Sequence, residues 1–402
     1  MPAEILILGG GFAGLAAAEE LASRWGSKRY RIRLLDRRHE NVFAPLLPDL
    51  ISARVRGEHI AYALEPCLKR MGVEYIHGNV KAIHPKEGRV ETFEGEHRAD
   101  YIIICLGCDT NYFGDEHIKR HSVGLKWIEE GVTINVRATK MIDSAKADGE
   151  TANFLVVGGG YTGIEAASHL AYLAKVKTGL PYGETERFAR VIIAEKTNRI
   201  LSSLSDKSRG WAAELVRSYG IEIVTNATVQ KFADGDNATL TNGTVIHRPL
   251  VLWTAGVAPG PAVAAMDAPK EHGDRLAVDK YLRLPGSESV FAAGDVACAR
   301  TRGHKEGLRM AVQFSLVSGR IAAENVKRTI EGRPLKEFDP VDPGYLVPLA
   351  PGHAAGVVLG HESKGLTPFL LHYFMSLVRS RGRHNRLSIF GDLWKELVTD
   401  ER

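Results

Sequence analysis

The stretch Ile5-Leu6-Ile7-Leu8-Gly9-Gly10-Gly11-Phe12-Ala13-Gly14 decides the fold of this chain. A short apolar run leads into a glycine turn, and an alanine-rich segment follows it. Gly9, Gly11 and Gly14 match the G-x-G-x-x-G motif. Glycines at these positions permit a tight turn, a close approach of the backbone to a pyrophosphate, and close packing of a helix on a strand. The stretch therefore predicts a strand, a turn and a helix whose N-terminus binds a dinucleotide.

The same design recurs at Phe154-Leu155-Val156-Val157-Gly158-Gly159-Gly160-Tyr161-Thr162-Gly163, where Gly158, Gly160 and Gly163 take the motif positions. We therefore predict an α/β protein with two Rossmann-like dinucleotide-binding domains, the second inserted in the first. The expected bounds are 1–115 and 285–332 for the first domain, 116–284 for the second, and 333–402 for a C-terminal α/β segment that ends in amphipathic helices.

Apolar runs and helical periodicity predict the remaining elements. The expected strands are residues 32–35, 101–106, 191–194, 251–254 and 289–292. The expected helices are residues 15–25, 164–174 and 314–329. Strands that alternate with helices indicate parallel sheets.

Acidic residues complete the first nucleotide site. Asp36 ends the second expected strand, roughly 20 residues after the motif, where an acid binds a ribose hydroxyl. Gly294-Asp295 follows the strand at 289–292, and its carboxylate suits a ribityl hydroxyl while the glycine lets the cofactor lie close. Together these residues indicate FAD at the first motif.

The second site has its own acids. Glu195 ends the strand after the second motif, farther along than the roughly 20 residues usual for this position, and the stretch 175–190 is predicted to be an insertion that accounts for the excess. A carboxylate there repels a 2′-phosphate, which favours NADH over NADPH. Glu165 has two interpretations: an acid that complements the helix dipole, or a group beside the nicotinamide.

Composition limits the class of protein. Among the 402 residues, 25% are charged and 44% hydrophobic, with a net charge of +4, which is ordinary for a globular protein and does not favour nucleic-acid binding. The four cysteines make no disulfide scaffold and no metal site, and we interpret Cys105 and Cys108 as structural. No signal peptide or bilayer-spanning helix is expected, so we expect a cytoplasmic protein.

The C-terminal segment carries an apolar helical stripe beside basic residues. Its apolar positions are Leu366, Phe369, Leu370, Tyr373, Phe374, Leu377 and Val378, with a second set at Leu387, Ile389, Phe390, Leu393, Trp394, Leu397 and Val398. Arginines stand at 379, 381, 383 and 386. This pattern favours the surface of an anionic membrane, and the alternative is a helix packed on the protein or in a dimer interface.

The motifs together carry a resemblance to a known family. They are the paired glycine motifs, Phe43-Ala44-Pro45-Leu46-Leu47, Gly107-Cys108-Asp109-Thr110-Asn111-Tyr112-Phe113, Gly159-Gly160-Tyr161-Thr162-Gly163-Ile164-Glu165, the strand ends at 105–107 and 254–256, Gly294-Asp295, and Asn385-Arg386. With them the chain resembles the type II NADH:quinone oxidoreductases, which belong to the two-dinucleotide-binding-domain flavoprotein superfamily. The resemblance covers nearly the whole chain.

The resemblance implies FAD and NADH as cofactors. It also implies hydride transfer from NADH to FAD, followed by transfer of two electrons to a membrane quinone of a respiratory chain, without proton pumping. The chain is then expected to lie peripherally on the cytoplasmic side of the cell membrane, with a homodimer possible. Expected FAD contacts are Gly9, Gly11, Phe12, Ala13, Gly14, Asp36, Arg37, Pro45, Val80, Leu106, Gly107, Gly294, Asp295, Val312, Gln313 and Lys364. Expected NADH contacts are Gly158, Gly160, Tyr161, Thr162, Gly163, Glu165, Glu195, Ala255 and Gly256. Glu165 and Gln313 are the expected catalytic residues.

One stretch departs from the family pattern. The family's quinone site carries an Ala-Gln-x-Ala-x-Gln-Gln-Gly run. In residues 312–319 of this chain, Gln313 matches the first glutamine and Gly319 matches the final glycine, but the later glutamines are missing. Two alternatives stay open: a soluble NADH-dependent flavoprotein reductase with another acceptor, and a redox sensor that responds to NADH. Disulfide reductases and sulfide:quinone oxidoreductases are disfavoured, because their cysteine sets are missing here.

Overall fold

The computed structural model describes residues 2–23, 29–233, 236–301, 306–350 and 352–399, with the side chains of 233, 350 and 396–399 left out. Trp25, where the first helix was expected to end, and the side chains of Leu397 and Val398 lie outside this set. The chain divides into two compact units. The first unit comprises Met1–Asn41, Tyr62–Asp109 and Val257–Val341, and the second comprises Val42–Ala61, Thr110–Gly256 and Asp342–Arg402.

A parallel five-stranded sheet forms the centre of the first unit, in the order β22-β9-β1-β2-β5. These strands are β1 (Ala3–Leu8), β2 (Tyr30–Asp36), β5 (Glu74–His77), β9 (Tyr101–Ile104) and β22 (Val290–Ala292). Ile5 pairs with Ile32 on one side and with Tyr101 on the other. Residues 5–8 of β1 are fully buried, as expected for a central parallel strand covered on both faces.

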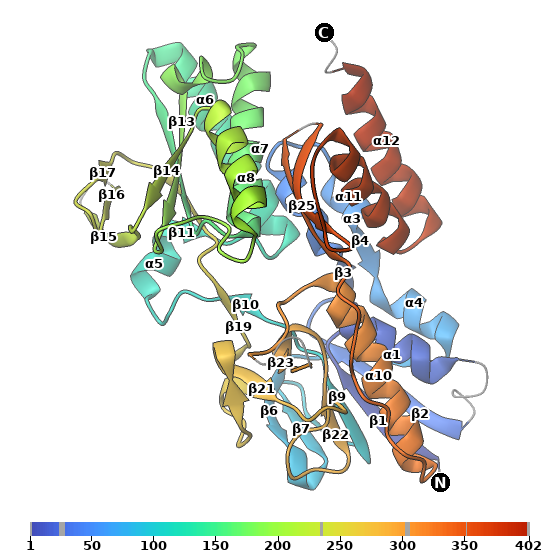
Figure 1. Ribbon diagram of the computed structural model, residues 1–402. Coiled ribbons are helices and arrows are strands. Elements are labelled where there is room, and N and C mark those ends of the chain that lie inside the picture. The colour runs from blue at the N-terminus through green and yellow to red at the C-terminus, as the bar shows by residue number, and fades with distance from the viewer. Residues whose placement is uncertain (1, 24–28, 234–235, 302–305, 351, 400–402) are drawn as a thin grey trace. The chain divides into compact units, whose positions relative to one another are not determined.

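Helices α1 (Phe12–Ala22) and α10 (Val312–Ile330) pack against each other beside this sheet (Figure 1). Gly319 makes the close approach possible, because a Cβ there would lie 2.1 Å from the Ala13 carbonyl oxygen. The rest of the first unit comprises α4 (Leu64–Met71), the antiparallel sheet β6 (Val80–His84), β7 (Arg89–Thr92) and β8 (Glu96–Arg98), α9 (Pro261–Ala264), and the small sheet β20 (Lys270–Glu271), β21 (Arg275–Ala277) and β23 (Ala297–Cys298).

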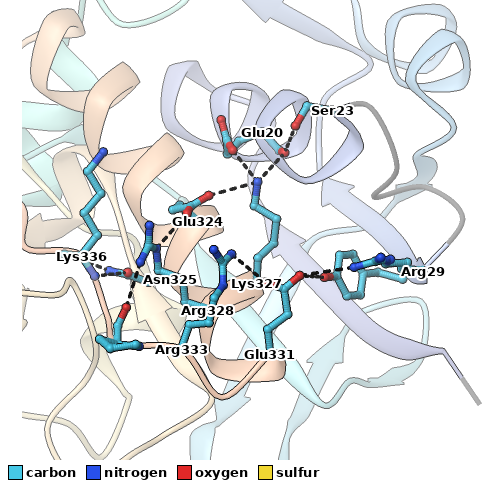
Figure 2. A network of polar contacts seen from close by, with 12 residues as sticks. Glu20, Ser23, Arg29, Glu324, Asn325, Lys327, Arg328, Glu331, Arg333 and Lys336 are labelled. Atoms are coloured by element: carbon cyan, nitrogen blue, oxygen red, sulfur yellow. Dashed lines mark hydrogen bonds and ion pairs between the residues drawn. The ribbon is translucent and has the colours of Figure 1, made fainter.

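Polar contacts reinforce the pairing of α1 with α10, as Figure 2 shows. The Lys327 ammonium donates to the Glu20 backbone oxygen at 3.2 Å and to its carboxylate, and it also lies 3.2 Å from the Glu324 carboxylate. Asn325, fully buried, donates to the carbonyl oxygens of Tyr281 and Lys336 at 2.9 Å each. The helix that follows the first glycine motif is therefore fixed by both packing and ion pairs.

The second unit repeats the parallel design, in the strand order β11-β18-β12-β13-β14. The strands are β11 (Ser122–Val123), β12 (Ala152–Val157), β13 (Ala189–Glu195), β14 (Ile221–Thr225) and β18 (Leu250–Trp253). The accompanying helices are α5 (Glu116–His121), α6 (Ile128–Asp148), α7 (Tyr161–Thr178) and α8 (Asp206–Ser218), with the antiparallel sheet β15 (Val229–Ala233), β16 (Asn237–Leu240) and β17 (Val245–Ile246). The structure thus confirms the predicted α/β fold with a duplicated dinucleotide-binding unit.

The C-terminal segment belongs to the second unit. It forms the antiparallel sheet β24 (Gly344–Ala350), β25 (His353–Val358) and β26 (His361–Gly365), which contacts α7 and α8, and then helices α11 (Leu366–Arg379) and α12 (Arg383–Thr399). The 3₁₀ helices η1 (Ala44–Leu46) and η2 (Pro48–Leu50) and helix α3 (Gly57–Ile60) precede them in the same unit (Figure 1). Short strands β3 (Glu40–Val42), β4 (Ala61–Ala63), β10 (Asp109–Thr110) and β19 (Val257–Ala258) stand where the chain passes between units. Among the helices of the described ranges, none has the length and apolar character that crossing a bilayer requires.

Candidate cofactor-binding sites

The first glycine turn has a conformation that other residues adopt only with strain. Gly9 has a φ of +100°, and a Cβ there would lie 2.4 Å from the Cys105 carbonyl oxygen. A Cβ at Gly14 would lie 1.8 Å from the Gly9 carbonyl oxygen, because this glycine sits inside the first turn of α1 against the end of β1. Both glycines are therefore required by the packing of helix on strand.

Gly11 differs from its two neighbours in the motif. Its φ is −73°, and a Cβ there would meet no atom of the described residues within 4 Å. Open space lies in front of this backbone, at the N-terminus of a helix with no side-chain cap. The turn thus fits the pyrophosphate of a dinucleotide, since free N–H groups at a helix start bind phosphate.

Asp36 ties the end of β2 to this turn. One carboxylate oxygen accepts the Gly10 N–H at 2.5 Å, and the other accepts the Arg38 N–H at 2.7 Å. Burial raises the pKa of Asp36, against the lowering effect of these hydrogen bonds and of the nearby arginines. Each carboxylate oxygen keeps a second lone pair, so the residue can hold a ribose hydroxyl while it orders the turn.

Gly294 and Asp295 lie between β22 and the start of α10, also in the first unit. The Gly294 N–H donates to the Ser318 hydroxyl at 2.9 Å, and the Ser315 hydroxyl donates to the Asp295 carboxylate at 3.2 Å. A Cβ at Gly294, whose φ is +77°, would lie 2.9 Å from the Ala13 Cβ. The Gly-Asp pair is therefore brought to the first glycine turn, and Ser315 and Ser318 orient it.

The second glycine turn reproduces the first in atomic detail. Gly158 has a φ of +108°, and a Cβ at Gly163 would lie 1.9 Å from the Gly158 carbonyl oxygen. A Cβ at Gly160 would meet nothing within 4 Å among the described residues, and its φ is −77°. The Glu195 carboxylate accepts the Gly159 N–H at 2.7 Å, as Asp36 does in the first unit, and its other oxygen accepts the Thr197 N–H at 2.8 Å. The second unit therefore fits a second dinucleotide.

The other residues expected from the sequence have these places. In the first unit, Phe12 and Ala13 begin α1, Val80 begins β6, Leu106 and Gly107 follow β9, Val312 and Gln313 begin α10, and Arg37 pairs with Asp109 at 2.8 Å. In the second unit, Pro45 lies in η1, Tyr161 and Thr162 begin α7, Ala255 and Gly256 follow β18, and Lys364 lies on β26 with its ammonium 4.7 Å from the Trp211 ring centroid.

Glu165 lies on the second turn of α7, just beyond the glycine motif. Burial, with the nearby Asp49 carboxylate, raises the pKa of Glu165 well above its usual range. A raised pKa favours the protonated form of the acid, which is the form that can donate a proton. The sequence alone did not reveal Asp49, because it lies far from Glu165 in the chain.

The four cysteines form no disulfide. All four are free and buried. The Cys108 thiol donates to the Asp295 carbonyl oxygen at 3.4 Å, whereas burial raises the pKa of the Cys105 thiol. Among the described residues, no three His, Cys, Asp or Glu side chains gather so as to hold a metal ion.

Known proteins with these features are oxidoreductases. The family model for pyridine nucleotide-disulphide oxidoreductases matches residues 3–317, so the chain belongs to this family. It is an oxidoreductase whose cofactors are FAD and NADH. A curated relative, the type II NADH:quinone oxidoreductase of Staphylococcus aureus, is 24% identical over 379 residues, which cover 90% of this chain and 91% of the relative.

Solved structures agree on the fold. The structure of NDH2 from Plasmodium falciparum in complex with NADH superposes with a TM-score of 0.86 at 15% identity, covering 100% of this chain and 99% of that one. The sulfide:quinone oxidoreductase from Aquifex aeolicus gives a TM-score of 0.77 at 17% identity, covering 99% and 95%. The predicted resemblance to type II NADH:quinone oxidoreductases is confirmed.

Proposed function

We propose that this protein oxidises NADH and reduces a membrane quinone through FAD, with no proton pumping. The observation that carries the proposal is the second glycine turn followed directly by Glu165, an acid whose pKa is raised by burial and by the Asp49 carboxylate. Reducing a quinone takes two protons as well as two electrons, so an acid with a raised pKa has a direct use as a proton donor. The relatives named for this reaction support the same acceptor.

Each of the two units is assigned one cofactor. Gly9, Gly11 and Gly14, with Asp36 and Asp295, are assigned to FAD in the first unit. Gly158, Gly160 and Gly163, with Glu195, are assigned to NADH in the second. The other contacts expected from the sequence, and the domain bounds predicted there, belong to the same proposal.

The residues of the chain position the reactants. When bound, FAD accepts a hydride from NADH and passes two electrons onward. The glycine turns fix each pyrophosphate, and the carboxylates of Asp36 and Glu195 fix the adenosine end, so that the reacting rings need little reorientation. Glu165 supplies a proton, and Gln313 at the start of α10 is assigned to the acceptor.

The proposal places the protein peripherally on the cytoplasmic side of the cell membrane. Large apolar side chains of α11 and α12 are exposed: Leu366, Leu370, Phe374, Val378, Leu387, Phe390 and Trp394. Arginines 379, 381, 383 and 386 stand among them. Apolar and basic side chains on one pair of helices favour an anionic lipid surface, which also holds the quinone.

An anaerobic titration tests the function. Purified flavoprotein is reduced with NADH while the flavin absorbance is followed, and then mixed separately with a short-chain ubiquinone and a naphthoquinone. We expect stoichiometric bleaching by NADH and rapid reoxidation by at least one quinone. Bleaching without quinone-dependent reoxidation would overturn the quinone assignment and favour another acceptor. That acceptor is the second candidate, because residues 312–319 depart from the quinone-site pattern of the family. A stable reduced complex without turnover would indicate a sensor.

A further inference from the structure

A hollow of about 210 Å³ on the second unit lies outside every role assigned so far. We call it the arginine pocket, because Arg120, Arg137 and Arg248 line it. Arg120 lies on α5, Arg137 on α6, and Arg248 in the segment before β18. Helix α5 packs on β15, and α6 packs on β18 (Figure 1), so tertiary packing brings the three cations to one place.

The rest of the lining is mostly apolar. It includes Met141 of α6, Phe232 of β15, and the buried Pro249 and Leu250. The Phe232 ring is stacked on the His121 imidazole, with ring centroids 4.9 Å apart and planes 16° apart. A concave surface that combines apolar side chains with a few charged groups is typical of a small-molecule site.

The guanidinium groups are available to a ligand. Arg120 Nε donates to the Glu116 carbonyl oxygen at 3.2 Å, which orients the side chain and leaves its terminal nitrogens without a partner among the described residues. Arg137 has no hydrogen bond or ion pair within the described ranges. Arg248 lies 3.8 Å from Glu150, but both side chains are about 70% exposed, and such a pair contributes little.

The backbone fixes the place of Arg248. Its φ is +40°, a conformation that residues other than glycine adopt at a cost. The Arg248 N–H donates to Asn237 Oδ1 at 3.1 Å, which ties this turn to β16. Strained backbone of this kind persists where the surrounding structure holds it, and it is frequent at ligand-binding sites.

Charge indicates the class of ligand. The pocket holds the three arginines and one carboxylate, that of Asp236, so these groups leave a net of two positive charges. His121 Nε2 lies 3.7 Å from Asp236 Oδ1 and shares its field. A phosphate monoester carries about two negative charges at neutral pH, and its oxygens accept paired hydrogen bonds from arginine. The apolar part of the lining suits an organic group attached to that phosphate.

The pocket lies at the opposite end of β18 from the second glycine turn. Leu250, the first residue of β18, lines the pocket. The Thr254 hydroxyl, just beyond the other end, donates to the Gly158 carbonyl oxygen at 3.1 Å. At about 3.3 Å per residue, the strand separates the two places by roughly 13 Å. A small ligand in the pocket therefore leaves the glycine turn open.

We propose that the arginine pocket is a second ligand site of this unit, which binds a small organic phosphate. The phosphate group lies against the guanidinium groups of Arg120, Arg137 and Arg248, and the organic group lies against Phe232 and Met141. That this site is separate from the NADH site rests on the proposed function, which assigns NADH to the second glycine turn.

Calorimetry tests the site with three simple probes. The FAD-loaded protein is titrated with phenyl phosphate, with inorganic phosphate and with benzoate, all in the presence of saturating NAD⁺. We expect one site for phenyl phosphate, at least about tenfold tighter than for inorganic phosphate, which has no apolar group to bury. Benzoate, with one charge fewer, should also bind at least about tenfold more weakly.

Single substitutions assign the binding to the pocket. Arg137→Gln and Arg248→Gln should each weaken phenyl phosphate at least about tenfold, because each removes a hydrogen bond to a charged group. Asp236→Asn should tighten it, since that change removes the one carboxylate of the lining. The matched control is Arg217→Gln, at an exposed arginine of α8 outside the pocket, which should leave the affinity unchanged. Melting temperatures show that each variant is folded.

Three results would overturn the proposal: no saturable binding of phenyl phosphate, wild-type affinity in both Arg137→Gln and Arg248→Gln, or displacement of phenyl phosphate by NAD⁺. The last result would place the anion at the second glycine turn instead. If NADH does not reduce the flavin, the proposed function fails, yet the arginine variants, measured without NAD⁺, still decide whether the pocket binds phenyl phosphate.

Discussion

Two of the glycines in each motif serve the fold, and the middle one serves the ligand. A Cβ at Gly160 meets no described atom, while one at Gly163 would strike the Gly158 carbonyl oxygen at 1.9 Å. The same pair of roles is seen at Gly11 and Gly14. This distinction gives a test that separates binding from stability.

Gly160→Ala should fold normally and bind NADH poorly. Its methyl group occupies only the open space, so we expect the melting temperature to be unchanged and the KM for NADH to rise at least about tenfold, which is a loss of ~1.4 kcal/mol. Gly163→Ala is the contrasting variant, and overpacking there should cost about 1–3 kcal/mol of stability. Thermal melts and steady-state kinetics measure both. Equal stability loss in the two variants would contradict the assignment.

Asp295 is assigned to flavin, and the Ser315 hydroxyl orients it at 3.2 Å. Asp295→Ala should yield folded protein with little bound flavin, because a hydrogen bond to a charged group contributes about 1.5–3 kcal/mol. The ratio of flavin to protein absorbance gives the result. Asp267→Ala, at an acid of the same unit whose side chain is 99% exposed, is the control and should keep its flavin. A fully yellow Asp295→Ala protein would refute the role.

Helices α11 and α12 carry two separate surfaces. Phe369 and Tyr373 are buried against the second unit, while Phe374 and Leu387 are 60% and 72% exposed. The buried set explains why the helices dock, and the exposed set has no role in that docking. The exposed set can therefore be changed without unfolding the unit.

Replacing Phe374 and Leu387 together by glutamine should release the protein from membranes. Each large apolar side chain contributes about 1.5–3 kcal/mol when it leaves water, so sedimentation with phosphatidylglycerol–phosphatidylcholine vesicles should fall at least about tenfold. Val176→Gln alters an apolar residue of α7 that is 59% exposed and should leave vesicle binding intact. If the double variant keeps its vesicle binding but loses a dimer, the helices form a protein interface instead.

Elements were largely predictable, because apolar runs mark buried strands whatever their neighbours. The expected helices at 164–174 and 314–329 correspond to α7 and α10, but these begin earlier, at Tyr161 and Val312. The Ile164 N–H donates to the Gly160 carbonyl oxygen at 3.0 Å, so the third motif glycine lies inside the helix rather than before it. Hydrophobic periodicity does not reveal the start of a helix whose first turn contains a motif glycine.

The hydrogen bond between Tyr373 and Asp49 was not predictable, since the two residues are 324 positions apart and only the fold joins them. The position of His169 was a weak indication in the sequence that it lies near Glu165, because it stands one helical turn after that residue. The duplicated motif and its acids were evident from sequence, because their chemistry depends on short spacings. Residues that meet through tertiary packing have no such spacing.

Three titratable side chains of the second unit, those of Glu165, His169 and His372, predict how stability varies with pH. Burial lowers the pKa of His372 to about 4 and that of His169 well below its usual value of 6.5. Groups with a lowered folded pKa contribute stability that is complete above 6.5 and is lost as the pH falls, because the unfolded chain binds their protons first. Glu165, whose pKa is raised, contributes stability below 4.5 that is lost as the pH rises through its folded pKa.

Below pH 6.5 the two histidines therefore lower the free energy of unfolding as the pH falls, whereas above pH 4.5 Glu165 lowers it as the pH rises. Urea unfolding of His372→Phe should show a shallower acid side, by up to about 1.4 kcal/mol per pH unit for one proton. Glu165→Gln should remove the loss of stability that sets in as the pH rises above 4.5. Parallel curves for wild type and His372→Phe between about pH 6.5 and about pH 4 would show that the histidine is not buried in its neutral form.

The hydrogen bond from the Gly10 N–H to Asp36 is equivalent to the one from the Gly159 N–H to Glu195. This equivalence has a consequence for inhibition. FAD and NADH differ in their reactive halves but share an adenosine diphosphate half, and it is this shared half that both turns are built to hold. Free ADP is therefore a fragment that fits both glycine turns. We expect calorimetric titration of flavin-free protein with ADP to reveal two sites of weak affinity, of which Gly11→Ala removes one and Gly160→Ala the other, so that the adenylate pool of a cell competes with both cofactors at once.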